Sequence, residues 1–257
     1  MEQLFVALAS AWTWVVLAAC TIIWLPVMVL LRVVTLPFDP GRYWVGLFFR
    51  KIAVVTAALN PLWRFRRSGI TVPDPRRPYV VVSNHESFAD ILLISHLPWE
   101  MKWMSKAEIF RIPVLGWNMT LAGDIPVLRG VRRSAVEAIR RAREVLAQRV
   151  SIIIFPEGTR STTGELLPFK DGAFRLAIEA GVPILPLVVY GTRTVLRKHD
   201  WRFGRSRAEV RVLPPVETTG LTLKDMPELR ERVRDLIVAA RRELQKAETP
   251  ETRILSE

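Results

Sequence analysis

The N-terminal part of the chain contains a long apolar segment. Residues 4–31 are 28 consecutive residues without a charged side chain, whereas about 20 apolar residues suffice to cross the hydrocarbon core of a bilayer as a helix. Trp12, Trp14 and Trp24 suit positions at the membrane interface, and Pro26 is expected to end or kink the first helix. The segment therefore predicts an apolar helical element that either spans a membrane or lies in it.

A second apolar stretch follows at residues 43–59. Arg50 and Lys51 interrupt it, so we expect it to lie in the headgroup region rather than to cross the bilayer. Residues 1–60 are thus predicted to form a membrane-associated helical element, and residues 61–257 an α/β domain. Basic residues follow the first apolar segment, and the positive-inside tendency then predicts that the α/β domain lies on the cytoplasmic side.

The composition narrows the possible partners. The net charge is +12 and half of the residues are hydrophobic, which suits an anionic membrane surface or an acidic carrier protein. Nucleic-acid binding is not expected, because the sequence lacks a basic stripe with regularly spaced aromatic residues. The single cysteine, Cys20, excludes an internal disulfide and a multi-cysteine zinc site. His85, His96 and His199 are the three histidines and are widely separated, so no metal site is predicted.

Apolar runs alternate with helical patterns in the rest of the chain. The predicted strands are residues 79–82, 102–104, 125–127, 152–155, 184–189 and 209–213. Helices are predicted from a capping-box pattern at Ser134 and Glu137, at residues 172–180 with Gly181 at the end, and after Asp225. This alternation predicts an α/β fold with a layered mixed sheet that is flanked by helices.

A histidine and a carboxylate follow the predicted strand 79–82. His85 precedes Asp90 by five residues, or about 500° on a regular helix, so the two side chains cannot share one face of a helix interior. We therefore expect His85 in the turn after the strand and Asp90 in the first turn of the next helix. An imidazole takes a proton near neutral pH, and a carboxylate on its far nitrogen fixes the tautomer. The pair can act as a general base and its orienting group, but a surface histidine before a helix-start carboxylate has the same pattern.

A second polar turn follows the predicted strand 152–155. Gly158 lets the backbone approach a ligand closely, and Arg160 offers a planar fork of donors that suits a phosphate. Thr159 adds a hydroxyl, and Glu157 could orient Arg160 or accept a substrate hydroxyl. An ordinary strand-to-loop turn with solvated charges would contain the same residue types.

Taken together, the two turns resemble the glycerolipid acyltransferase family, of the 1-acyl-sn-glycerol-3-phosphate acyltransferase type. The pattern N-H-x-x-x-x-D begins at Asn84, and F-P-E-G-T-R-S begins at Phe155. Three further blocks occur in the family order. They are residues 123–129, with Pro126 at a position that is usually aromatic, residues 169–172 and residues 182–186.

The resemblance implies a glycerol-3-phosphate acyltransferase-like fold and a reaction. A fatty acyl group would pass from an acyl thioester, either acyl-CoA or an acylated carrier protein, to the free hydroxyl of 1-acylglycerol-3-phosphate, forming phosphatidic acid. No other cofactor is implied. The residues implied are His85 as the general base, Asp90 as its orienting carboxylate, and Glu157, Gly158, Thr159, Arg160, Arg129 and Lys106 for the acceptor. Because the chain has no G-x-S-x-G elbow and no cysteine near a histidine, direct transfer is expected rather than a covalent acyl-enzyme.

Two other functions remain open. The same chemistry could act on another acceptor, such as a lyso-ornithine lipid, another lysophospholipid or a glycolipid. A non-catalytic basic protein of the membrane surface would explain the charge and the tryptophans, but it would not explain the paired motifs.

Overall fold

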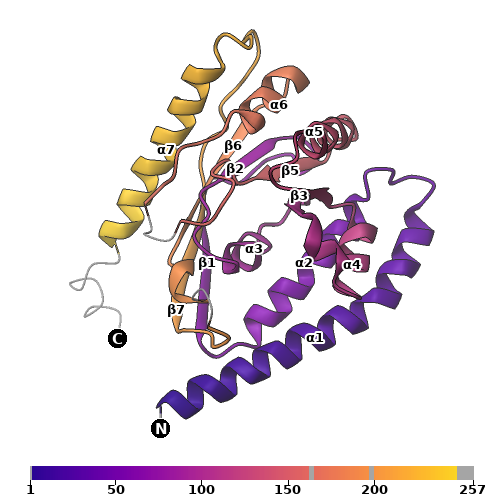
Figure 1. Ribbon diagram of the computed structural model, residues 1–257, viewed down its shortest axis with the longest axis vertical. Coiled ribbons are helices and arrows are strands. Elements are labelled where there is room, and N and C mark those ends of the chain that lie inside the picture. Colours follow the sequence, from indigo (N-terminus) through magenta and orange to yellow (C-terminus); the bar gives the residue numbers. More distant parts are fainter. Residues whose placement is uncertain (1, 162–164, 197–199, 248–257) are drawn as a thin grey trace.

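A mixed sheet forms the centre of the protein (Figure 1). The computed structural model describes residues 2–161, 165–196 and 200–247. In this part of the chain the strands are β1 (Trp63–Gly69), β2 (Val80–Ser83), β3 (Met101–Lys106), β4 (Ile125–Val127), β5 (Ser151–Ile154), β6 (Ile184–Tyr190) and β7 (Ser206–Val212). The helices are α1 (Glu2–Thr35), α2 (Tyr43–Ala58), α3 (Ala89–Ile94), α4 (Leu115–Ala122), α5 (Arg132–Ala147), α6 (Gly172–Ala180) and α7 (Met226–Ala247), with the 3-10 turns η1 (Ala107–Arg111) and η2 (Thr192–Thr194).

The strand order within the described residues is β1-β7-β6-β2-β5-β3-β4. β6, β2, β5, β3 and β4 run parallel to one another, β7 is antiparallel to β6, and β1 is parallel to β7. The carboxyl ends of five adjacent strands therefore lie at one edge of the sheet. The prediction of a layered mixed sheet flanked by helices is confirmed, although β1 is absent from the predicted strands.

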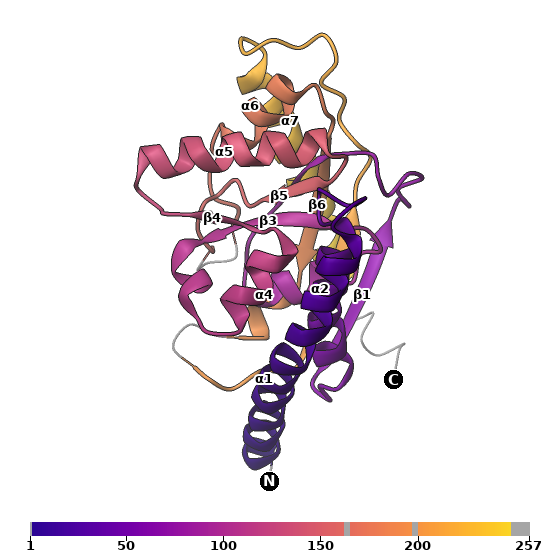
Figure 2. The same ribbon diagram turned by 90° about the vertical axis from the view of Figure 1, so that its right-hand side faces the viewer.

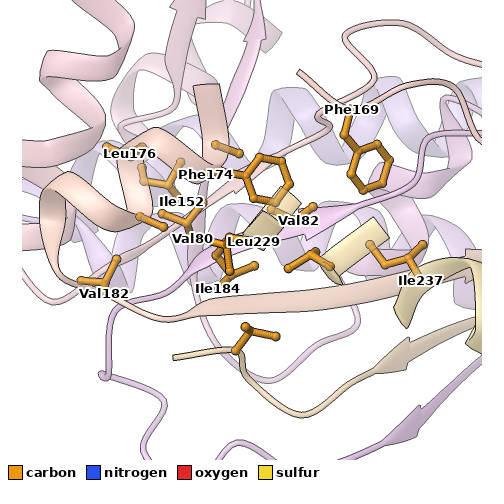
Figure 3. Close-up of a cluster of buried hydrophobic side chains, with 14 of the residues drawn as sticks. Val80, Val82, Ile152, Phe169, Phe174, Leu176, Val182, Ile184, Leu229 and Ile237 are labelled. Atoms are coloured by element: carbon orange, nitrogen blue, oxygen red, sulfur yellow. The ribbon is translucent and has the colours of Figure 1, made fainter. Parts of the chain in front are cut away.

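One face of the sheet is covered by α5, α6 and α7 (Figures 1 and 2). Figure 3 shows the core beneath them, where Val80, Ile152 and Ile184 from three adjacent strands meet Phe174 of α6 and Ile237 of α7. All the residues of β2 are buried, as expected of a parallel strand that is covered on both faces. On the other face, α3 packs over the central strands.

The N-terminal helices form a further layer on that second face. Val16 and Met28 of α1 are buried in a cluster with Val45 of α2 and Met119 of α4. In Figure 1, α1 runs along the lower side of the molecule beneath α2 and α4. The predicted boundary at residue 60 falls between α2 and β1.

Pro26 does not end the first helix, which continues from Glu2 to Thr35. Packing holds the helix on both sides of the proline, since Cys20 and Met28 are buried in the same cluster. Trp24 also donates a hydrogen bond from Nε1 to the carbonyl of Phe48, at 3.2 Å. These contacts offset the roughly 3 kcal/mol that a proline costs inside a helix.

The expectation that Arg50 reaches the lipid headgroups is wrong. Its guanidinium is buried and donates to both oxygens of Asp124, with 3.2 Å from Nη1 to Oδ2, and its Nη2 lies 3.6 Å from Oε1 of Glu100. Lys102 is also buried and lies 2.9 Å from the same Glu100 oxygen. These four residues form the buried ion cluster, in which two cations balance two carboxylates, so the arginine is stabilised inside the protein. Only Lys51 of the predicted basic pair is exposed.

The helix-cap predictions have mixed outcomes. The capping box at Ser134 is wrong, because α5 begins at Arg132 and the Ser134 hydroxyl accepts a hydrogen bond from the Leu128 N–H at 2.9 Å. The helix at residues 172–180 is confirmed, and Gly181 follows it with φ 63°. α7 begins directly after Asp225, whose carboxylate accepts from the N–H and hydroxyl of Thr222.

Candidate active site

The carboxyl edge of the sheet gathers the predicted site residues. His85 follows β2, Lys106 ends β3 and Arg129 follows β4, and residues 157–160 follow β5. Because these four strands are parallel neighbours, their carboxyl ends lie at one edge of the sheet, which is where ligands of α/β proteins commonly bind.

His85 and Asp90 are in direct contact. His85 lies in the turn after β2 and Asp90 is the second residue of α3, as the five-residue spacing predicts. Nδ1 of the imidazole lies 2.7 Å from Oδ2 of Asp90. The same oxygen accepts the backbone N–H groups of Glu86 and Ser87, and Thr192 donates its hydroxyl to Oδ1. Since the carboxylate acts as an acceptor throughout, Nδ1 carries a proton, and in the neutral imidazole the lone pair is then on Nε2.

Ring stacking and backbone hydrogen bonds hold His85 in place. It stacks on Phe155, with the ring centroids 4.0 Å apart and 15° between the planes. The backbone N–H of His85 donates to Oε1 of Glu157 at 2.7 Å, and its carbonyl accepts from the Ser161 N–H at 3.0 Å. The side chain of His85 is 11% exposed, so the ring is held in place but is not completely shielded from solvent. These bonds tie the two motif turns to each other.

Glu157 joins backbone segments rather than pairing with Arg160. Its Oε1 accepts from His85, and its Oε2 accepts the N–H of Leu167 at 2.9 Å. The side chain is buried, and this burial raises the pKa of the carboxyl group. Because both oxygens are occupied by backbone donors, the geometry makes Glu157 a positioning residue.

Two arginines at this edge are free to bind an anion. Arg160 and Arg129 are exposed and have no carboxylate partner among the described residues. Lys106 is exposed as well, but its Nζ lies 3.3 Å from Glu108. Gly158 adopts φ 71°, and a Cβ there would lie 2.6 Å from Nζ of Lys170, so the turn requires glycine.

Sequence reasoning missed two groups around the histidine. Glu86 is buried and accepts a hydrogen bond from Nε of Arg241 at 2.9 Å. Burial raises the pKa of Glu86 to about 7, against the lowering effect of Arg241. Arg241 lies over the ring of Tyr190, 5.7 Å from its centroid. The other missed group is Thr192, and in both cases the partner lies too far along the chain for a local pattern to indicate it.

No metal centre is indicated in the part of the chain that the structure describes. It contains no group of three histidine, cysteine, aspartate or glutamate side chains that could hold a metal ion. His199 lies outside the described residues.

The sequence of the chain is similar to known acyltransferases. Residues 64–190 match the model of the Acyltransferase family, a range that contains both motif turns. The chain is 41% identical over 172 residues to 1-acyl-sn-glycerol-3-phosphate acyltransferase alpha of Homo sapiens, covering 66% of this chain and 61% of that protein. It is 36% identical over 173 residues to 1-acyl-sn-glycerol-3-phosphate acyltransferase of Saccharomyces cerevisiae, covering 66% and 57%. The chain thus spans less than two thirds of the length of these curated relatives.

The fold is similar to that of a solved structure. The crystal structure of the 1-acyl-sn-glycerophosphate acyltransferase PlsC from Thermotoga maritima aligns with a TM-score of 0.80 and 25% identity, covering 95% of this chain and 98% of that chain. Such coverage includes most of α1, so the likeness extends beyond the matched catalytic region. The matched region, residues 64–190, therefore belongs to the Acyltransferase family, and the fold shared with PlsC extends over 95% of the chain.

Proposed function

We propose that the protein transfers a fatty acyl group from an acyl thioester to the free hydroxyl of 1-acylglycerol-3-phosphate, forming phosphatidic acid. The observation that carries this proposal is the 2.7 Å contact between His85 and Asp90 at the same sheet edge as two unpaired arginines. The names of the relatives support the same acceptor.

The proposed reaction is a direct transfer with His85 as the general base. Nε2 of His85 takes the proton of the acceptor hydroxyl, and the oxygen attacks the thioester carbonyl. Asp90 holds Nδ1–H and stabilises the imidazolium that forms. When the tetrahedral intermediate collapses, the C–S bond breaks and the imidazolium returns the proton to the departing thiolate.

Three backbone N–H groups near the start of α3 already have acceptors and are not available to the oxyanion of that intermediate. The N–H groups of Glu86 and Ser87 donate to Asp90, and that of Ala89 donates to the Ser87 hydroxyl. The donors of Glu86 and Ser87 hold the Asp90 carboxylate, which in turn orients the base.

A phosphate monoester is the acceptor group that fits the remaining side chains. Arg160 and Arg129 both present bidentate donors, and Lys106 adds a third cation at the end of the neighbouring strand. A glycolipid acceptor would leave these cations without a partner. A thiol-release assay with acyl-CoA and a panel of lysolipids tests the proposal, and faster transfer to a lysolipid without a phosphate monoester would contradict it.

Arg160→Ala should weaken use of a phosphate-bearing acceptor. Loss of a charge-assisted hydrogen bond costs roughly 1.5–3 kcal/mol, or about tenfold to a hundredfold in the KM for lysophosphatidic acid. The KM for the acyl donor should change little. Arg149→Ala is a matched control, because Arg149 is also exposed but precedes β5 at the opposite edge of the sheet. Equal changes in acceptor and donor kinetics would mean that Arg160 supports the fold instead.

We also propose that the protein attaches to a membrane through α1. Among the described residues, α1 is the one helix that is long and apolar enough to cross a membrane, yet one of its sides packs on α2 and α4. Its opposite side is apolar and exposed, with Leu8, Ile22 and Leu30 at 61%, 60% and 64% exposure. This arrangement favours a helix that lies in one leaflet with the α/β domain on the cytoplasmic side, where anionic lipids attract basic proteins.

The triple variant Leu8→Glu/Ile22→Glu/Leu30→Glu should no longer bind to vesicles but should remain folded. Each apolar side chain contributes about 1.5–3 kcal/mol when fully buried, so vesicle co-sedimentation should fall strongly, with a matching loss of activity on long-chain lysolipid. Val136→Glu is the control, because Val136 is 63% exposed on α5, across the sheet. Unchanged sedimentation of the triple variant would refute attachment through α1.

Deletion of residues 1–60 is a poor substitute for that experiment. It would remove α1 and α2 from buried clusters and leave Asp124 without Arg50. The truncated domain would therefore lose part of its core, and a loss of activity would not report on the membrane.

A further inference from the structure

A basic groove lies beside the edge strand β1, outside the site described above. It is a cavity of about 690 Å³, lined by β1 and β7, by the C-terminal ends of α2, β6 and α7, and by Asn60 and His96. Its charged lining consists of Arg64, Arg66, Arg207 and Arg211 with one carboxylate, Glu209. The volume lies in the range of typical small-molecule sites, about 300–1,000 Å³.

Three of these arginines are not neutralised. Arg66 and Arg207 are exposed and have no partner among the described residues, and Arg64 reaches only the carbonyl of its neighbour Trp63, at 3.5 Å. Arg211 differs, because it lies 3.5 Å from Glu209 and 3.0 Å from Glu243. The basic groove therefore carries an excess of positive charge.

The strand register places two of these charges opposite each other. In the backbone register, Arg64 of β1 is aligned with Arg207 of β7, and Arg66 is aligned with Glu209 without a side-chain contact between them. The two strands are parallel, so Arg64 and Arg207 are neighbours in the sheet, and their like charges repel each other. An anion bound between the two guanidinium groups would reduce this repulsion.

The basic groove connects to the catalytic turn through a short chain of contacts. Tyr190 lines the groove and pairs with Glu209 across the strands. Arg241 lies over Tyr190 and bonds to Glu86, the residue after His85. β2 and β1 are separated by β6 and β7, so three strand spacings, about 14 Å in all, lie between the strand that precedes His85 and the far side of the groove at β1.

We infer that the basic groove binds the phosphate-bearing nucleotide of a coenzyme A thioester, an inference that rests on the proposed acyl transfer. The nucleotide is a compact polyanion and fits a recessed cavity with clustered arginines. The broad acidic surface of a carrier protein would fit such a cavity less well. Its pantetheine arm is comparable to roughly four extended residues, or about 14 Å, and so reaches from the groove to His85. The acceptor cations follow β5, β3 and β4 on the other side of β2, so the two substrates approach the base from opposite sides.

The double variant Arg66→Gln/Arg207→Gln tests this inference. Loss of two charge-assisted contacts should raise the KM for acyl-CoA by about tenfold or more, with kcat and the KM for lysophosphatidic acid within about twofold. With acyl-pantetheine, which has no phosphate, the double variant should equal the wild type. Arg232→Gln is the matched control, because Arg232 is exposed on α7 but lies about 18 Å along the helix from the groove residue Leu244.

Several results would overturn the inference. An equal loss with acyl-pantetheine would place the two arginines elsewhere in the reaction. A loss confined to an acylated carrier protein would make the groove a protein-docking surface, and weaker vesicle binding with an unchanged donor KM would make it a lipid-headgroup site.

Direct binding separates this inference from the proposed function. Coenzyme A titrated into the full-length protein without an acceptor should bind to the wild type and to Arg232→Gln, and at least tenfold more weakly to the double variant. If the wild type transfers no acyl group, the proposed function fails, and this titration still decides whether the groove binds the nucleotide. Equal affinities in all three proteins would overturn the inference.

Discussion

Replacement of His85 by alanine should lower kcat for acyl transfer by about 10²–10⁴-fold, the range that a general base typically contributes. The fold should survive, because Asp90 keeps the two backbone donors and Thr192 when the imidazole is gone. Single-turnover assays with acyl-CoA and lysophosphatidic acid measure the loss, and circular dichroism with thermal melting checks the fold.

The companion variant Asp90→Asn separates orientation from proton transfer. An asparagine amide would hold the imidazole in the wrong tautomer, so kcat should fall while the KM for the acceptor stays close to wild type. Residual activity of His85→Ala above about a tenth of the wild type would exclude His85 as the base. An unchanged kcat for Asp90→Asn would leave Asp90 as a helix-start carboxylate.

The largest expected effect on stability comes from the buried ion cluster. Asp124→Ala removes the acceptor of both Arg50 bonds and of the Trp103 N–H. Breaking a buried pair leaves an uncompensated charge, which costs about 3–5 kcal/mol. Urea-induced unfolding in detergent should therefore show a much lower midpoint than for the wild type.

A surface carboxylate provides the control for that measurement. Asp74 also pairs with an arginine, Arg149, at 2.9 Å, but both side chains are at least half exposed. Asp74→Ala should change the free energy of unfolding by less than about 1 kcal/mol. If Asp124→Ala is equally mild, then water reaches Arg50 and the cluster is not a dry interior pair.

The central part of the fold is predictable from local patterns, whereas β1 is not. β2, β5 and β6 are short apolar runs with polar residues after them, and a buried parallel strand produces that pattern directly. In β1, Trp63 and Phe65 alternate with arginines, a period of two that the dense charge obscures. The strand exists because it pairs along its whole length with β7, which comes much later in the chain.

The residues of the candidate site also fall into two groups, those that a local sequence pattern predicts and those that it does not. His85 and Asp90 are predictable because both belong to one turn and the five-residue spacing limits their geometry. Arg241 and Thr192 reach the same turn from distant segments, so no local pattern indicates them. The burial of Arg50 is equally invisible in the sequence, because a cation inside an apolar helix suggests the headgroup region until its carboxylate partners are known.

The buried ion cluster also links the N-terminal helical layer to the strands that end at the candidate site. Arg50 belongs to α2, whereas Lys102 and Asp124 lie at the beginnings of β3 and β4. Lys106 and Arg129 lie at or after the far ends of the same two strands, so these short strands connect the helical layer to the cationic edge. Under the proposed membrane attachment, the length of the strands sets the height of these cations above the acyl chains. The enzyme would then select a lipid partly by the distance of its phosphate from the glycerol backbone. The depth of the phosphate in the membrane would matter more than the shape of the headgroup.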